Sequence, residues 1–98
     1  MNFYVNLSDD AKKTLKELKT TPFLLKRFKA VSNALVRLAG NPRHPSLQTH
    51  VYRSILGPNG EKVFEAYAEN DTPGAYRILF YYGNERGRID ILMITPHP

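Results

Sequence analysis

Two residues with useful chemistry stand near the ends of the last stretch of the chain, AYRILFYYGNERGRIDILMITPHP. Arg77 lies near its start, and a guanidinium donates paired hydrogen bonds to phosphate or carboxylate groups. His97 lies near its end, and an imidazole gains or loses a proton near neutral pH. Between them are two apolar runs typical of core strands. Arg77 and His97 therefore either have only a structural role in a small sheet or belong to a functional site.

Alternation along residues 76–82 predicts on which face of a sheet Arg77 lies. Successive side chains of a strand point to opposite faces. One set should meet a helical layer and the other should face away from it; the first set is Tyr76, Ile78, Phe80 and Tyr82, and the second is Arg77, Leu79 and Tyr81. In the preceding strand, Glu65, Tyr67 and Glu69 share a parity. We therefore expect polar and aromatic side chains to line the open face beside Arg77.

The composition indicates a folded, basic protein. Hydrophobic residues make up 42% of the 98 residues and charged residues 23%, which is typical of globular chains. The 14 Lys and Arg residues outnumber the 9 Asp and Glu residues, which favours a polyanionic partner such as nucleic acid or an acidic protein segment. With no cysteine, a disulfide, a zinc thiolate site and a thiol nucleophile are excluded. The sequence shows neither a signal peptide nor an apolar run of roughly 20 residues, so we expect a cytoplasmic protein.

Two helices are predicted in the first half of the chain. Ser8 can cap a helix over residues 9–19, in which Ala11, Leu15 and Leu18 fall on one face. A second helix should begin with Thr21 as cap and Pro22 at the first helical position, and Gly40 should end it. Its apolar stripe consists of Leu24, Phe28, Val31, Leu35 and Leu38. The two helices should form an antiparallel hairpin whose stripe packs on a sheet.

The rest of the chain predicts strands. A short strand is expected at residues 3–5, and a further strand is expected to begin at residues 51–55 after the proline-rich loop. Residues 61–70, 75–83 and 87–95 read as three strands joined by short turns. The predicted fold is α+β: an N-terminal strand and a helical hairpin packed on an antiparallel sheet in two layers.

The order of these elements and the segment EKVFEAYAENDTPGAYRILFYYGNERGRIDILMITPHP resemble the RelE/ParE toxin superfamily of bacterial toxin–antitoxin systems. The resemblance covers nearly the whole chain, with the helical hairpin and the NPRHPSL loop included. Its most specific part is GAYRILFYY, which is similar to the glycine, aromatic, arginine and alternating apolar residues of the family's third strand. The resemblance implies one RelE/ParE-like toxin domain over residues 1–98, with a RelE-like two-layer fold.

Members of that superfamily fall into two functional groups. One consists of ribonucleases that cut messenger RNA, usually in the ribosomal A site, and the other of ParE-type proteins that poison DNA gyrase. Both are held inactive by an antitoxin. The function that the resemblance favours is a metal-independent endoribonuclease that cleaves messenger RNA and so inhibits translation. No cofactor is expected.

The resemblance also implies roles for particular residues. Arg77 matches the strand arginine that holds the scissile phosphate, and His97 falls where some members keep a C-terminal acid. Glu65 lies near the position of a base, with Arg53 as support. The expected catalytic residues are Arg77, His97 and Glu65, and the expected RNA-binding residues are Arg53, Tyr67 and Tyr81.

Other functions stay open at this point. The pair of lysines that RelE carries before its arginine is replaced by residues 64–67, FEAY, which favours either a non-enzymatic gyrase inhibitor or a member that only binds its antitoxin. Arg77 is also consistent with a simple cross-strand ion pair with Glu65 or Glu69. His44 and His50 match no local pattern of metal ligands and are expected to be loop residues, so no metal site is predicted.

Overall fold

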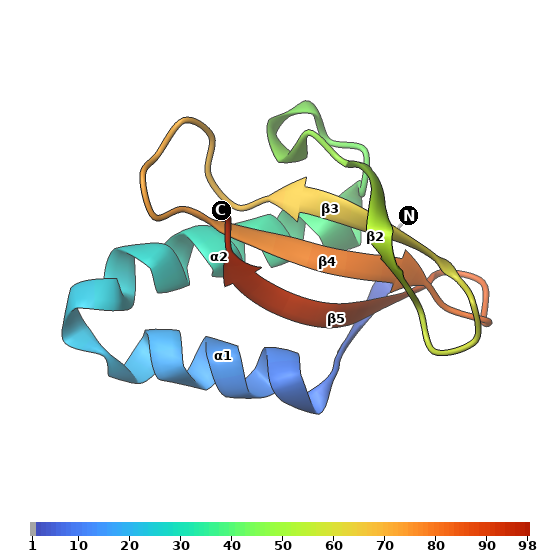
Figure 1. Cartoon of the computed structure of the whole chain (residues 1–98), viewed down its shortest axis with the longest axis horizontal. Helices are drawn as coiled ribbons and strands as arrows, with labels where there is room; N and C mark the ends of the chain where they lie inside the picture. Colours follow the sequence, from blue (N-terminus) through green and yellow to red (C-terminus); the bar gives the residue numbers. More distant parts are fainter. Residues whose placement is uncertain (1) are drawn as a thin grey trace.

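The computed structural model describes residues 2–98 as two helices on one side of a five-stranded sheet (Figure 1). The helices are α1 (Asp9–Thr20) and α2 (Leu25–Gly40), with short 3-10 turns at Pro22–Leu24 and Pro45–Leu47. The strands are β1 (Tyr4–Leu7), β2 (His50–Leu56), β3 (Lys62–Tyr67), β4 (Tyr76–Tyr82) and β5 (Arg88–Pro96). The α+β prediction is confirmed.

The start of α1 follows the predicted capping chemistry. The Ser8 hydroxyl accepts a hydrogen bond from the backbone N–H of Ala11, and Asp9 and Asp10 occupy the first turn. The same hydroxyl donates to the Leu92 carbonyl of β5 at 2.6 Å. Ser8 therefore satisfies an unpaired helix amide and also ties the helix to the sheet.

The predicted start of the second helix is wrong by one turn. Residues Pro22–Leu24 form a 3-10 turn, and α2 begins at Leu25. Thr21 does not cap it, because its hydroxyl donates to the Glu17 carbonyl of α1 at 2.7 Å. The link between the helices is thus a tight turn held by the end of α1.

The sheet has the order β1-β5-β4-β3-β2, and its central pairs are antiparallel as predicted. The first strand departs from that prediction, because β1 pairs parallel to β5, with Tyr4 opposite Arg88 and Leu7 opposite Ile91. No turn links these two strands, which come from opposite ends of the chain, so their direction depends on how the helical hairpin returns the chain to the sheet.

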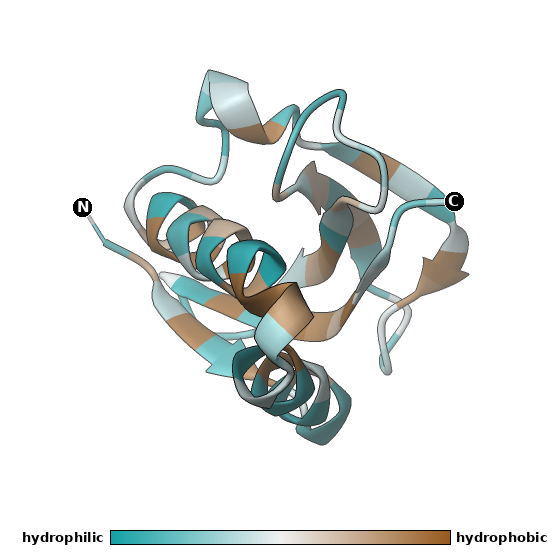
Figure 2. Ribbon diagram, turned by 90° about the vertical axis from the view of Figure 1, so that its left-hand side faces the viewer, coloured by the Kyte–Doolittle hydropathy of each residue, from teal (hydrophilic) through white to brown (hydrophobic). Residues whose placement is uncertain are grey.

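The main core lies between the helices and the sheet. Figure 2 looks nearly along α1 and α2 and shows apolar segments on both helices and on the strands. Val31 and Leu38 are fully buried, and Leu24, Phe28 and Leu35 pack against the same cluster, so the predicted stripe is confirmed. Across from it, Phe80 is fully buried and stacks on Phe64 with ring centroids 5.7 Å apart.

The face of the sheet away from the helices is less exposed to solvent than the strand alternation predicted. Leu79 and Val63 point away from the helices, yet both are fully buried. Tyr52 of β2 stands directly opposite Val63 in the strand register. This face therefore has a small apolar centre of its own. Polar groups beside it are partly shielded from solvent.

Among residues 2–98, neither helix is long and apolar enough to cross a lipid bilayer.

Candidate functional site

Glu65 is the centre of a cluster of polar side chains on the face away from the helices. It lies on β3, and only 4% of its surface is exposed. Its Oε2 accepts a hydrogen bond from Nη1 of Arg77 at 2.8 Å, and its Oε1 lies 2.7 Å from Nε2 of His50. A carboxylate this buried needs such partners, because an unpaired buried charge is strongly unfavourable.

His50 is the member of the cluster that the sequence analysis missed. It was expected to be a loop residue, but it is the first residue of β2 and stands directly opposite Glu65 in the register. Its Nδ1 lies 2.7 Å from the carbonyl oxygen of Gln48, which has a left-handed backbone with φ 48°. Extending the strand alternation back to residue 50 would have placed His50 on the face of Glu65 and was the available signal.

Arg77 enters the cluster from β4. Its side chain is 13% exposed, and its guanidinium carbon lies 5.0 Å from the centre of the Tyr52 ring, in cation–π geometry. Burial opposes the charged form, but hydrogen bonding and charge from Glu65 and Tyr52 outweigh it and raise the pKa of Arg77 above its usual value. Arg77 Nε is buried and has no hydrogen-bond partner within residues 2–98.

His97 reaches the same cluster from the end of β5. Its backbone N–H donates to the Ala75 carbonyl at 2.9 Å, which ties the end of the chain to the start of β4 (Figure 1). Its Nε2 lies 3.9 Å from Oε2 of Glu65, and its side chain is 41% exposed. Its Nδ1 lies 2.9 Å from the Pro98 carbonyl. His97 therefore lies beside the carboxylate, and its side chain is partly open to solvent.

Tyr67 stands between the two histidines. Its ring packs edge-to-face with His50 and His97, with centroid distances of 5.6 and 5.1 Å. These contacts fix the plane of the tyrosine ring against the cluster.

A cleft of about 570 Å³ opens beside this tyrosine. It is bounded by the end of β3, the loop before β4 and the end of the chain, and its lining includes Gln48, Tyr67, Asn70, Thr72, Tyr76 and His97. A side-chain hydrogen bond of 2.8 Å from Gln48 to Asn70 joins the two loops at its edge. The cluster therefore borders a hollow large enough to admit part of a ligand.

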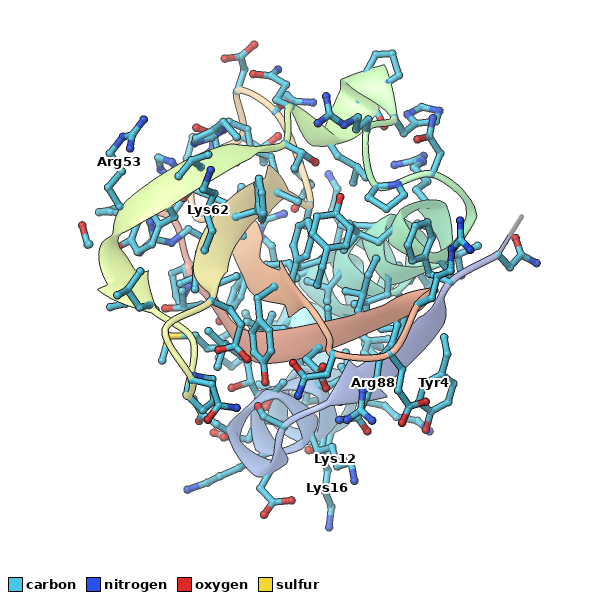
Figure 3. All side chains as sticks on the ribbon, turned by 90° about the vertical axis from the view of Figure 1, so that its right-hand side faces the viewer. Tyr4, Lys12, Lys16, Arg53, Lys62 and Arg88 are labelled. Atoms are coloured by element: carbon cyan, nitrogen blue, oxygen red, sulfur yellow. The ribbon has the colours of Figure 1, made fainter. Side chains whose placement is uncertain are left out.

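Two of the predicted RNA-binding residues lie away from the cluster. Arg53 of β2 is exposed and extends from the sheet into solvent (Figure 3). Tyr81 lies toward the other end of β4, opposite Asp90, in a hollow that Glu61 and Glu85 also line. Burial, and then the Asp90 and Glu61 carboxylates, raise the pKa of Tyr81. Arg88 lines the same hollow but pairs with Asp90 at 2.9 Å, so these surroundings do not favour a phosphate beside Tyr81.

Glu69 also departs from the predicted arrangement. It was expected on the open face beside Arg77, but β3 ends at Tyr67, so the alternation stops before it. Its carboxylate instead forms an ion pair with Arg27 of α2 at 3.2 Å. Of the two cross-strand partners predicted for Arg77, only Glu65 pairs with it in the structure.

The cluster is not arranged as a metal centre. Within residues 2–98, no group of three or more His, Asp or Glu side chains is placed to hold a metal ion together. The chemistry available at the cluster is hydrogen bonding, charge and proton transfer by Glu65, Arg77 and the two histidines.

The helical hairpin on a five-stranded mixed sheet matches the fold of RelE-like toxins. By sequence, no family model and no curated protein matches the chain. Among solved structures, it is similar to a chain of the archaeal RelE-RelB complex from Pyrococcus horikoshii, with 15% identity, a TM-score of 0.67 and coverage of 98% of this chain and 96% of that one.

Two further structures support the same assignment of fold. The YoeB/ParE toxin from Agrobacterium tumefaciens has 5% identity and a TM-score of 0.71, and covers 97% of this chain and 99% of its own. YoeB from Staphylococcus aureus, solved as a dimer, has 14% identity and a TM-score of 0.65 over the full length of both chains. At these identities the likeness shows the fold alone, and the predicted RelE-like two-layer fold is confirmed.

Proposed function

We propose that the protein is the toxin of a toxin–antitoxin system and acts as a metal-independent endoribonuclease on messenger RNA. One observation carries the proposal: Arg77 of β4, Glu65 of β3 and His97, which directly follows β5, meet in one partly buried cluster beside a cleft. RNA cleavage without a metal requires a cation that binds the phosphate, a base and an acid. In this cluster the arginine, the carboxylate and the partly exposed imidazole can supply these three groups.

In the proposed reaction, the 2′-hydroxyl of one nucleotide attacks the adjacent phosphorus. A base removes the hydroxyl proton, the new bond from the 2′-oxygen to phosphorus forms, and the bond from phosphorus to the 5′-oxygen breaks. The departing 5′-oxygen takes a proton from an acid. The products are a 2′,3′-cyclic phosphate and a 5′-hydroxyl, and the reaction requires RNA because DNA lacks the attacking group.

Arg77 is the proposed phosphate ligand and Glu65 the proposed base. In the resting protein the two are partners at 2.8 Å, so a bound phosphate must replace Glu65 as the acceptor of Arg77. That exchange releases Oε2 of Glu65 next to the site of the phosphate. Phosphate binding and exposure of the base are therefore coupled in this scheme.

His97 is the proposed acid. Its Nε2 lies 3.9 Å from Oε2 of Glu65 and its side chain is partly exposed, and in this scheme a proton on Nε2 passes to the leaving oxygen. Tyr67, which is held between the two histidines, is the proposed stacking surface for a base next to the cleaved bond. Arg53 and Tyr81 lie outside this arrangement and have no part in the proposed reaction.

An antitoxin is the proposed protein partner. Two of the solved structures with this fold are complexes described as RelE-RelB and RelBE2, and the second comes from Mycobacterium tuberculosis. On the present chain, Phe23 at the turn before α2 is 86% exposed and Val36 of α2 is 73% exposed. Large apolar side chains in solvent on a basic protein are suited to an acidic, amphipathic partner segment.

A second function has its own support. Arg77 is only 13% exposed and is already neutralised by Glu65, which is the expected state of a structural ion pair. A toxin that inhibits DNA gyrase by binding it would need no catalytic group, and a chain that only binds its antitoxin would need none either. The buried ion pair favours this class of non-enzymatic function.

One preparation of purified protein can separate these functions. It should be incubated with messenger RNA, with and without ribosomes, and the new ends should be mapped and tested for 2′,3′-cyclic phosphate. The same preparation should be added to a gyrase supercoiling assay. We expect RNA cleavage and unchanged supercoiling; inhibited supercoiling with intact RNA would replace the ribonuclease proposal with the second one.

A further inference from the structure

We propose that His50 is a positioning residue that supplies the positive charge of the phosphate site. The inference rests on the proposed function, because it concerns the same cluster, but its test does not require RNA cleavage. Sequence reasoning gave His50 no role, whereas the structure places it directly opposite Glu65 on the edge strand β2.

The contacts of His50 fit a ring that donates from both nitrogens. Nδ1 lies 2.7 Å from the Gln48 carbonyl oxygen, and Nε2 lies 2.7 Å from Oε1 of Glu65. A carbonyl oxygen only accepts, and a carboxylate oxygen accepts as well. In the proposed arrangement both ring nitrogens therefore donate, and the ring carries two protons and a positive charge.

This charge changes what the cluster offers to a phosphate. Arg77 and Glu65 alone form a neutral pair, which has little attraction for an anion. With a charged His50 the group of three has one net positive charge, because two cations share one carboxylate. Arg77 can then exchange Glu65 for a phosphate without leaving the buried carboxylate unpaired, since His50 still holds Oε1.

His50 also has the exposure that this role requires. Its side chain is 46% exposed, whereas that of Glu65 is 6% exposed, so the ring lies between the buried carboxylate and the solvent. Its edge-to-face contact with Tyr67 links the same ring to the proposed stacking surface. The charge thus lies at the surface where an RNA strand would approach Arg77.

The test measures binding of an RNA oligonucleotide with 2′-O-methyl groups, which cannot be cleaved by the proposed reaction. Binding should be measured over a series of salt concentrations for the unmodified protein and for His50→Gln and His50→Arg. Glutamine keeps a donor toward Glu65 but has no charge, and arginine keeps both. For a single-stranded partner, loss of one contacting charge should lower the slope of log Kd against log salt by about 0.7.

We expect this loss of slope in His50→Gln, and a slope close to that of the unmodified protein in His50→Arg. Lys16→Gln is the matched control, because it removes one charge from α1 on the other layer and should leave the slope unchanged (Figure 3). An unchanged slope in His50→Gln, or no binding by the unmodified protein at low salt, would overturn the inference.

Two further readouts keep the result interpretable. Nitrogen-15 NMR of the unmodified protein at neutral pH should show both nitrogens of His50 protonated, and a ring with a single N–H would also overturn the inference. If the oligonucleotide binds with the expected slopes but natural RNA stays intact, the ribonuclease proposal fails while the role of His50 stands. If RNA is cleaved and His50→Gln has an unchanged slope, the ribonuclease proposal stands and the proposed role of His50 fails.

Discussion

Arg77 and Glu65 form a diagonal ion pair across β3 and β4. In the strand register Arg77 stands opposite Tyr67 and Glu65 opposite Leu79, yet Nη1 of Arg77 reaches Oε2 of Glu65 at 2.8 Å. The side chains are 13% and 6% exposed, so this pair is not the weak surface contact that such spacing often gives. Its removal should therefore affect both stability and any reaction at the cluster.

Arg77→Lys tests the phosphate role with little change in charge. Lysine keeps a cation near Glu65 but lacks the planar fork that binds a phosphate through two donors. If Arg77 stabilises the transition state, the rate of RNA cleavage should fall by about 10²–10³. Steady-state cleavage of a labelled RNA would measure this, and Arg53→Lys, on an exposed side chain outside the cluster, should retain full activity.

Arg77→Ala should lower the free energy of unfolding as well. It leaves Oε2 of buried Glu65 without its donor, which typically costs about 1–3 kcal/mol. Urea denaturation followed by circular dichroism would show the loss. A change near zero would mean that the carboxylate finds water or another partner, and would contradict the buried pair described above.

His97→Gln should slow RNA cleavage without unfolding the protein. Its side chain is 41% exposed, and glutamine can occupy that space but cannot supply an acidic proton. Loss of a general acid typically lowers a rate by about 10²–10⁴. His44→Gln, in the loop before β2, is the control for replacing a histidine. Equal rates for His97→Gln and the unmodified protein would remove His97 from the mechanism.

The helical stripe gives a prediction that does not depend on function. Leu38 of α2 is fully buried, so Leu38→Ala should cost about 2–5 kcal/mol through lost burial and the cavity left behind. Val36 lies two residues earlier on the same helix and is 73% exposed, so Val36→Ala should change stability by at most about 0.5 kcal/mol. Thermal and denaturant unfolding of the two variants would compare the two faces of the helix.

Tyr81 should make the folded state sensitive to alkaline pH. Burial and the Asp90 carboxylate raise the pKa of its hydroxyl, so the folded protein holds this proton more tightly than the unfolded chain. Its contribution to stability is complete below the unfolded pKa of about 10 and is lost as pH rises through the folded value. Tyr81→Phe should flatten this part of the stability curve; an identical alkaline loss in the variant would assign it to other groups.

Local periodicity in the sequence was enough to predict several parts of this structure. Spacings of three and four residues defined the buried stripe of α2, and the Ser8 cap defined the start of α1. Alternation by two placed Arg77, Glu65 and Tyr67 on one face of the sheet, because each strand fixes the side of its own residues. The order of elements was enough to predict an α+β fold.

The contacts among these residues depend on the tertiary structure. The register of β2 against β3 places His50 opposite Glu65, and the backbone bond from His97 to Ala75 brings the end of β5 to the same cluster. The same kind of long-range pairing makes β1 parallel to β5, whereas Glu69 leaves the sheet to meet Arg27. Such contacts join residues far apart in the chain, and their geometry depends on the packing of all the elements between them, which no local pattern encodes.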